Sequence, residues 1–174
     1  LTDFLTRARE RGFAVPQLGF DNALDHLRNS AVNANDPGDG ASVAYALYVL
    51  ARNGRPVIGD LRYLTGAKLD TFKTPMARAQ LGAALAMLGD RARAGRVFGA
   101  ALTMLEAQPV SLLSRPDYGS KLRDAAAVLA LLAESGLDAG AAPPDGLARA
   151  SAVLDTARDA VDYVSTQENN WLAL

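Results

Sequence analysis

Apolar residues recur at intervals of three and four through most of the chain, and this spacing predicts a succession of helices. The breaks between them fall at proline, glycine and asparagine, which favour turns. The expected helices run from Leu1 to Gly12, from Pro16 to the turn-forming run 33–40, and over residues 41–53, 57–66, 75–89, 94–105, 121–135, 147–164 and 165–174.

Two of these helices lack a polar face. Residues 41–53 and 121–135 are apolar nearly all round, so protein should surround them, whereas the second, sixth and eighth helices keep a charged face. This alternation predicts an inner and an outer layer. The 34 Ala and 26 Leu, against 11 Val and 1 Ile, also favour helices over strands. The expected fold class is therefore all-α, with at least seven helices, no sheet, and the two apolar helices among the most buried.

Charge and composition exclude several classes of function. Eighteen Lys and Arg residues against nineteen Asp and Glu give a net charge of −1, which provides no field to attract nucleic acid or an anionic membrane. The chain has no cysteine, so it contains no disulfide, thiolate metal site or cysteine nucleophile. No apolar run is long enough to cross a membrane, and the start at Leu1 is neither a signal peptide nor a methionine. We interpret the chain as a segment of a longer protein, with no cofactor, nucleic-acid partner or direct membrane contact of its own.

Three features indicate chemistry only weakly. His26 is the only histidine, and without nearby cysteines or paired carboxylates it makes neither a metal site nor a catalytic base, so we interpret it as a surface or interface residue. Asp36 and Asp39 resemble part of a calcium loop, but further ligands and a terminal Glu are missing, which favours a plain turn. Residues 75–108 carry most positions of one tetratricopeptide hairpin, although the pattern does not recur about 34 residues later. A helical-repeat interaction module stays an alternative on this hairpin alone.

Three separate segments resemble one family. The run Ser-Thr-Gln-Glu-Asn-Asn-Trp-Leu-Ala-Leu at 165–174 begins as a capping box and resembles the Ser-Thr-Gln-Asp/Glu segment that opens a late helix in the thioester domain of alpha-2-macroglobulins. The run Asp-Tyr-Gly-Ser-Lys-Leu-Arg-Asp at 117–124 is similar to the Asp-Tyr-Gly-Ser-x-x-Arg-Asp stretch of the bacterial members. Residues 1–10 are similar to their segment before the Asn-Ala-Leu-Asp-x-Leu helix, here Asn22 to Leu27. The family-motif residues are Asp117, Tyr118, Gly119, Ser120, Arg123, Asp124, Ser165, Thr166, Gln167, Glu168 and Trp171.

The resemblance implies part of an α/α toroid, namely the C-terminal part of the thioester domain of a bacterial alpha-2-macroglobulin. Members of that family are large protease traps, in which cleavage of a bait region triggers a rearrangement and a Cys-to-Gln thioester acylates the attacker. The family's Cys-x-Glu-Gln motif precedes the matched region by several helices, so the resemblance implies a structural segment without catalytic residues. Whether the parent carries the thioester stays open, because some bacterial members lack it. Complement-type relatives place a histidine in the corresponding loop, where it favours transfer to hydroxyls. The loop 33–40 has no histidine, so the resemblance implies attack on such a thioester by amines.

The resemblance also implies partners and a location. The partners are the rest of the parent chain and, through the parent, its target proteases. The parent is expected to be exported, either as a lipoprotein anchored at the periplasmic face of the inner membrane or as a secreted protein, in a host-defence-like role.

Two further expectations follow from a toroid architecture. An α/α-toroid enzyme, the other alternative, needs paired carboxylates or a metal set at the toroid centre, whereas the expected inner helices offer mainly Ala, Leu, Val and Tyr. A toroid without its first helices exposes apolar faces, so two copies of this segment are expected to pair through residues 1–5 or 171–174. The complete domain would lose that contact.

Overall fold

The structure is a computed structural model that describes residues 1–32, 40–109, 115 and 117–174. Within these residues the chain forms helices and no strand, as predicted. The elements are α1 (Thr2–Glu10), α2 (Gln17–Val32), α3 (Ala41–Arg52), α4 (Ile58–Ala67), the short 3-10 helix η1 (Leu69–Thr71), α5 (Pro75–Met87), α6 (Arg91–Ala107), α7 (Lys121–Glu134), α8 (Gly146–Asp159) and α9 (Thr166–Leu172).

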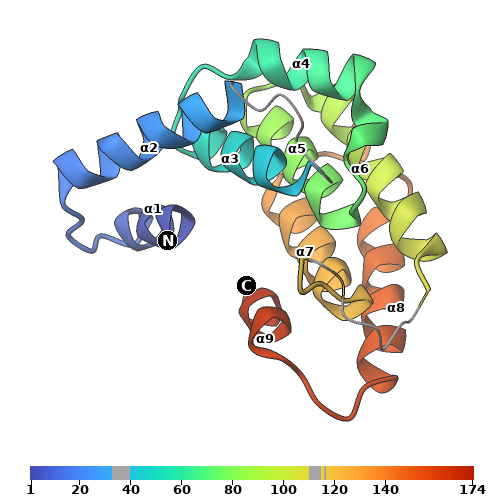
Figure 1. The fold of residues 1–174 in the computed structure, drawn as a ribbon. Coiled ribbons are helices and arrows are strands. Elements are labelled where there is room, and N and C mark those ends of the chain that lie inside the picture. The colour runs from blue at the N-terminus through green and yellow to red at the C-terminus, as the bar shows by residue number, and fades with distance from the viewer. Residues whose placement is uncertain (33–39, 110–114, 116) are drawn as a thin grey trace.

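The helices form an arc of two rows (Figure 1). The inner row consists of α1, α3, α5, α7 and α9, and each helix packs against the next one in that row. The outer helices lie against the inner ones, with α2 on α3, α4 and α6 on α5, and α8 on α7. Inner and outer helices therefore alternate along the chain, which is the arrangement of part of an α/α toroid and confirms the two predicted layers.

The inner helices are oriented in parallel. On one side of the arc, Ser120 before the first turn of α7 bonds Glu168 in the first turn of α9. On the opposite side, Arg52 in the last turn of α3 binds Glu10 in the last turn of α1 and Glu134 at the end of α7. The starts of the inner helices therefore lie on one side of the arc, and their ends lie on the opposite side.

The core lies along α3, α5 and α7. The prediction that residues 41–53 and 121–135 are among the most buried is confirmed, since 8 of the 12 residues of α3 and 9 of the 14 residues of α7 are buried. However, α5 is buried at 10 of its 13 residues, and the sequence did not single it out. Its polar residues concealed this, because Gln80 is only 2% exposed and the Arg78 side chain, which is 12% exposed, donates to the Phe72 carbonyl at 3.0 Å.

Most helix boundaries agree with the predicted ones. Thr74 caps α5 by accepting from the Ala77 N–H at 3.1 Å, as the Thr-Pro pair predicts. The clearest difference is α8, which ends at Asp159 rather than at residue 164. The residues that follow include Val161, Tyr163 and Val164, whose β-branched or aromatic side chains disfavour a helix. The chain then becomes extended at Ser165 to begin α9.

The hairpin predicted over residues 75–108 exists as α5 and α6. Its two helices approach closely at Gly82, where an added Cβ would lie 2.9 Å from Phe98 Cδ2. The hairpin packs into the arc between α3 and α7. The residues at 75–108 that match a tetratricopeptide hairpin therefore reflect close packing of one helix pair at the centre of the arc.

Candidate functional site

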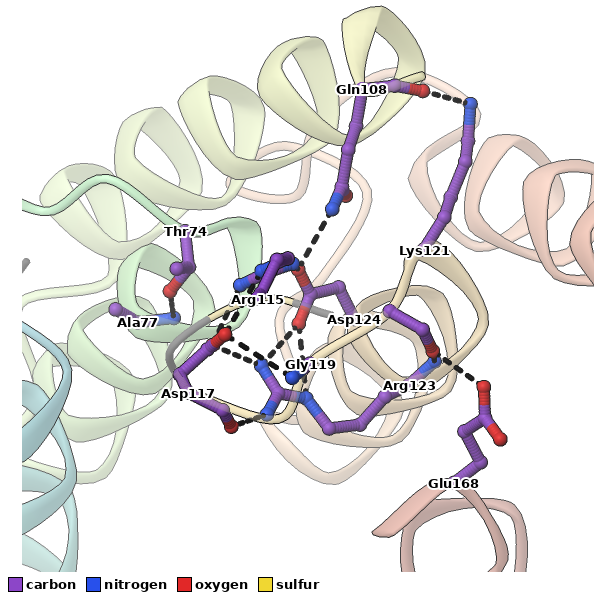
Figure 2. A network of polar contacts seen from close by, with 11 residues as sticks. Thr74, Ala77, Gln108, Arg115, Asp117, Gly119, Lys121, Arg123, Asp124 and Glu168 are labelled. Atoms are coloured by element: carbon purple, nitrogen blue, oxygen red, sulfur yellow. Dashed lines mark hydrogen bonds and ion pairs between the residues drawn. The ribbon is translucent and has the colours of Figure 1, made fainter. Parts of the chain in front are cut away.

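The structure brings together the two motif segments that lie far apart in the sequence. Residues 117–124 lead into α7 and residues 165–168 lead into α9, and both lie on the side of the arc where the inner helices begin. Figure 2 shows Glu168 next to the group formed by Asp117, Arg123 and Asp124. The two segments meet through one hydrogen bond, in which Ser120 Oγ donates to Glu168 Oε1 at 2.6 Å.

The first segment builds a network of two arginines and two aspartates. The Arg115 guanidinium donates to both oxygens of Asp117, from Nε to Oδ1 at 2.9 Å and from Nη2 to Oδ2 at 2.7 Å. Arg123 donates from Nη2 to the same Asp117 Oδ2 at 2.7 Å and from Nη1 to the Asp117 carbonyl at 2.9 Å. Two-pronged contacts of this kind fix the relative orientation of the charged groups as well as neutralising them.

Asp124 is the buried centre of this network, with 0% of its surface exposed. Its carboxylate accepts from Arg115 Nη1 at 2.6 Å and from Arg123 Nη2 at 2.9 Å. It also accepts from Gln108 Nε2 at 3.3 Å, and Gln108 stands directly after α6. A buried charge needs such partners, so Asp124 ties the end of α6 to the start of α7.

The ionisation of the network follows from these contacts. Burial alone would raise the pKa of Asp117, but the hydrogen bonds and charges of Arg123 and Arg115 outweigh it and lower that pKa below its usual range. Burial likewise opposes the charge of Glu168, whereas hydrogen bonds from Ser120 and Ser165 outweigh it and lower its pKa. Both carboxylates are therefore held in the ionised form.

The second segment forms the capping box predicted for it. Ser165 Oγ accepts from the Glu168 N–H at 3.3 Å, and the Ser165 N–H donates to Glu168 Oε2 at 2.6 Å. Glu168 thereby caps its own helix with one oxygen and binds Ser120 with the other. Ser120 is itself the cap of α7, accepting from the Arg123 N–H at 3.0 Å. The two helix caps are coupled through one carboxylate.

Gly119 and Tyr118 take positions that the motif alone does not explain. A Cβ at Gly119 would overlap the Arg123 guanidinium and the Asp117 carboxylate, so any other residue would have to displace these two side chains. Tyr118 has a left-handed backbone with φ 53° and a side chain that is 79% exposed. This residue is strained relative to ordinary backbone and contributes no burial to the network.

The remaining motif residues lie around the start of α9. Thr166 and Gln167 are exposed, while Trp171 is half-buried and packs against the core from its edge. Gln167 and Trp171 line a hollow on the inner side of the arc. Of the motif residues, those that interlock are Asp117, Gly119, Ser120, Arg123, Asp124, Ser165 and Glu168.

This arrangement is a structural clamp. Each aspartate oxygen of the network accepts at least one hydrogen bond from an arginine, so neither carboxylate is available as a base. Across the described ranges there is no cluster of His, Cys, Asp and Glu suited to a metal ion. His26 is exposed on α2, as expected for a surface residue. Asp36 and Asp39 lie outside the described residues.

Sequence reasoning missed Arg115, which lies between the helices predicted over residues 94–105 and 121–135. It also missed a second polar cluster on the opposite side of the arc, where the inner helices end. There Glu134 accepts from Arg7 Nη1 at 2.8 Å and from Arg52 Nη1 at 2.9 Å, and both arginines donate to the Tyr48 hydroxyl. No single sequence signal points to this cluster, because its members come from α1, α3 and α7.

Comparisons with known proteins place this geometry in a family. No family model matches the sequence. However, an alpha-2-macroglobulin of Xylella fastidiosa is 30% identical over 182 aligned residues, which cover 99% of this chain. The crystal structure of Salmonella alpha-2-macroglobulin reacted with methylamine superposes on 98% of this chain with a TM-score of 0.80 and 31% identity. This chain is homologous to a segment of the bacterial alpha-2-macroglobulins.

The homologous segment is a small part of an alpha-2-macroglobulin. This chain spans 11% of the Xylella protein and 11% of the Salmonella chain. It spans 27% of an Escherichia coli alpha-2-macroglobulin structure that runs from domain MG7 to the C-terminus, at 28% identity, 98% coverage of this chain and a TM-score of 0.77. The segment therefore corresponds to a region within the C-terminal portion of that alpha-2-macroglobulin.

Proposed function

We propose that this chain is a structural part of the thioester domain of a bacterial alpha-2-macroglobulin that traps proteases. The observation that carries the proposal is the match to bacterial alpha-2-macroglobulins over nearly the whole chain, in sequence and in fold. The two-layer arc supports the domain assignment, since an α/α toroid is the architecture implied by the motif segments.

The role of the segment in this proposal is mechanical. The clamp around Asp124 and the coupled caps of α7 and α9 fix how consecutive inner helices start. A rigid toroid holds its surface in one shape while neighbouring domains move around it. The segment supplies no acyl donor because it has no cysteine.

A protease assay on the full-length protein that contains this segment tests the trap role. With a thioester upstream, trypsin is expected to become covalently attached, and prior treatment with methylamine is expected to abolish the attachment, because the amine consumes the acyl donor. The isolated segment is the matched control, and its mass is expected to stay unchanged after methylamine. Methylamine incorporation by the segment, or a full-length protein that never retains trypsin, would contradict the proposal.

The location is part of the same proposal. We expect the parent in the periplasm, attached to the inner membrane through a lipid or released as a secreted protein. In the described residues no helix is long and apolar enough to span a membrane. Fractionation of cells that express the tagged parent checks this, and recovery of the folded parent from the cytoplasm alone would oppose it.

We further expect the isolated segment to pair with a second copy. Leu1 is 89% exposed and Phe4 is 69% exposed, so apolar side chains at the start of α1 face solvent. Sedimentation of the segment and of the complete domain at equal concentration tests this. A strictly monomeric segment, or a dimer that persists in the complete domain, would refute pairing through these ends.

A further inference from the structure

An open cavity of about 830 Å³ lies between the start of α5 and the C-terminal half of α6. Lys73 and Arg78 are in its wall on the side of α5, and Met104 is in its wall on the side of α6. Arg115 and Asp117 form the wall on the side of the clamp, and Figure 2 shows them next to the start of α5. The described lining residues fall between positions 73 and 117, far in the sequence from both ends of the chain. Cavities of about 300–1,000 Å³ are typical of sites for small ligands.

Arg78 brings an incompletely paired cation to this cavity. Its side chain is 12% exposed, and within the described residues its guanidinium donates one hydrogen bond, from Nε to the Phe72 carbonyl at 3.0 Å. Asp70 Oδ1 lies 3.6 Å from Arg78 Nη2, which is too long for a hydrogen bond, and the Asp70 side chain is fully exposed to water. Burial lowers the pKa of Arg78, and the charge of Asp70 offsets this effect only in part. The Nη1 and Nη2 donors of Arg78 therefore have no partner within the described part of the chain.

The clamp residues at the cavity add no net charge. Asp117 Oδ2 accepts from Arg115 Nη2 and from Arg123 Nη2, each at 2.7 Å. Arg115 and Arg123 also share the carboxylate of Asp124, at 2.6 and 2.9 Å. Two arginines and two aspartates thus neutralise one another, so Asp117 leaves no uncompensated negative charge to repel an anion.

Two cations remain without such compensation, namely Lys73 and Arg78. Lys73 is exposed and makes no ion pair within the residues that the structure describes. The negative end of α6 is also at the cavity, but Lys121 Nζ donates to the Gln108 carbonyl there at 2.6 Å and offsets it. The segment 110–114, which is Val-Ser-Leu-Leu-Ser, contains no carboxylate that could neutralise these cations. The charge balance of the cavity therefore favours an anion.

The donors at the cavity suit a carboxylate better than a phosphate. Phosphate sites at helix starts use free backbone N–H groups. At the start of α5, Pro75 has no N–H, and Thr74 accepts from the Ala77 N–H with its side chain and from the Arg78 N–H with its carbonyl. Side chains must therefore supply most of the donors, and a guanidinium binds a carboxylate through two parallel hydrogen bonds.

The rest of the wall is largely apolar. Pro75 of α5 and Ala100, Met104 and Ala107 of α6 contribute hydrocarbon surface to the cavity. Burial of apolar surface is favourable in water. A ligand that combines a carboxylate with an apolar stem thus matches both parts of the wall.

We propose that this cavity binds a carboxylate carried on an apolar stem, with Arg78 as its hydrogen-bond donor, Lys73 as a second cation and Met104 against the stem. The carboxylate belongs either to a small carboxylic acid or to an acidic side chain of a polypeptide. No covalent bond forms, and the proposal does not depend on the protease-trap role proposed above, so it survives the failure of that role.

Met104 provides the readout. The chain has three methionines, and Met104 lines this cavity, whereas Met76 and Met87 line other hollows. The 174-residue chain, labelled at its methionine methyl groups and kept at a concentration where sedimentation shows a monomer, is titrated while the three methyl signals are followed by NMR. The small probe is hydrocinnamate, with hydrocinnamamide as its uncharged control. The peptide probe is N-acetyl-Leu-Glu-Leu amide, with the corresponding Gln peptide as its control.

We expect both carboxylates to shift the Met104 signal in a saturable way while the Met87 signal stays in place. Each uncharged control is expected to bind at least about tenfold more weakly, because it lacks the charge that a guanidinium recognises. Tighter binding of hydrocinnamate identifies a small-molecule source, and tighter binding of the Glu peptide identifies a polypeptide source. Inorganic phosphate is expected to displace neither probe at an equal concentration.

Variants test the two cations. Arg78→Met is expected to weaken binding at least about tenfold and Lys73→Met at least about threefold. Arg96→Met removes an exposed cation of α6 outside the cavity and is expected to leave binding unchanged. Circular dichroism checks that each variant is folded, and Lys73→Met keeps the test decisive if Arg78→Met is not, because Lys73 is exposed.

Four results would overturn the proposal. They are a Met104 signal that does not move, uncharged controls that bind as tightly as the carboxylates, phosphate that displaces hydrocinnamate at an equal concentration, and a folded Lys73→Met protein that binds as tightly as the unmodified chain.

Discussion

Replacing Asp124 by asparagine is expected to destabilise the fold more than most single substitutions. Asparagine keeps the shape of the side chain but removes the charge that Arg115 and Arg123 share, at 2.6 and 2.9 Å. Asp124 is 0% exposed and the Arg123 side chain is 4% exposed, so water has little access to the contact between these two residues. Removing one member of a buried ion pair costs about 3–5 kcal/mol, against a total stability of about 5–15 kcal/mol for a domain.

Urea unfolding followed by far-UV circular dichroism measures this loss. The free energy of unfolding falls by about 1–3 kcal/mol per molar urea, so Asp124→Asn is expected to lower the midpoint by roughly 1.5–2.5 M for a slope near 2 kcal/mol per molar. Asp60→Asn, at an exposed position of α4, is the matched control and is expected to stay within about 0.5 kcal/mol of the unmodified chain.

A double-mutant cycle separates the ion pair from the simple loss of a side chain. Arg123→Met combined with Asp124→Asn removes both charges and leaves Arg115 paired with Asp117 through two hydrogen bonds. The double variant is therefore expected to lose at least about 1 kcal/mol less than the sum of the single variants. An Asp124→Asn protein within about 1 kcal/mol of the unmodified chain, or strict additivity in the cycle, would refute the reasoning about the clamp.

Two further perturbations test the surroundings of the clamp. Gly119→Ala forces a Cβ into the Arg123 guanidinium and is expected to lower the free energy of unfolding in urea by about 1–3 kcal/mol. The control Gly99→Ala, in α6, has open space around its Cβ and is expected to raise that free energy by about 0.5–1 kcal/mol. Equal effects of the two variants would show that the close approach at Gly119 is unimportant. The pKa of Glu168 is lowered below its ordinary 4.5, so its contribution is complete above that pH and is lost as the pH falls through the lower folded value. The unfolding free energy of Glu168→Gln is therefore expected to fall less steeply than that of the unmodified chain below about pH 4.5, and parallel curves would contradict the assigned contacts.

Much of the fold could be predicted because the information is local. The spacing of leucine and alanine locates the helices, and Thr74-Pro75 marks the start of α5 through groups within one turn of each other. The inner position of α3 and α7 also follows from local pattern, since a helix without a polar face should be surrounded by protein. The capping box at Ser165 and Glu168 is likewise a contact between residues three positions apart.

The rest could not be predicted because it depends on contacts between distant segments. Arg78 and Gln80 are polar in the sequence, yet Gln80 is 2% exposed and the Arg78 side chain is 12% exposed once α3 and α6 pack against α5. The motif at 117–124 indicated a family, but nothing in it showed that Ser120 reaches Glu168, 48 residues away. The misplaced end of α8 is an exception, because the side chains of Val161, Tyr163 and Val164 disfavour a helix locally.

The parallel inner row has a consequence for how the molecule unfolds. Stabilising contacts pass from each inner helix to the next, so its cooperativity resembles that of a linear array in which each unit depends on its neighbours. The units at α1 and α9 have a row neighbour on one side, whereas α5 is flanked by α3 and α7 and also covered by α6. Amide protection against hydrogen exchange should therefore decrease from α5 toward both ends of the row, giving separate units of local opening. The hydrogen bond between Ser120 and Glu168, which joins the caps of α7 and α9, then couples the opening of the last inner helix to that of the core.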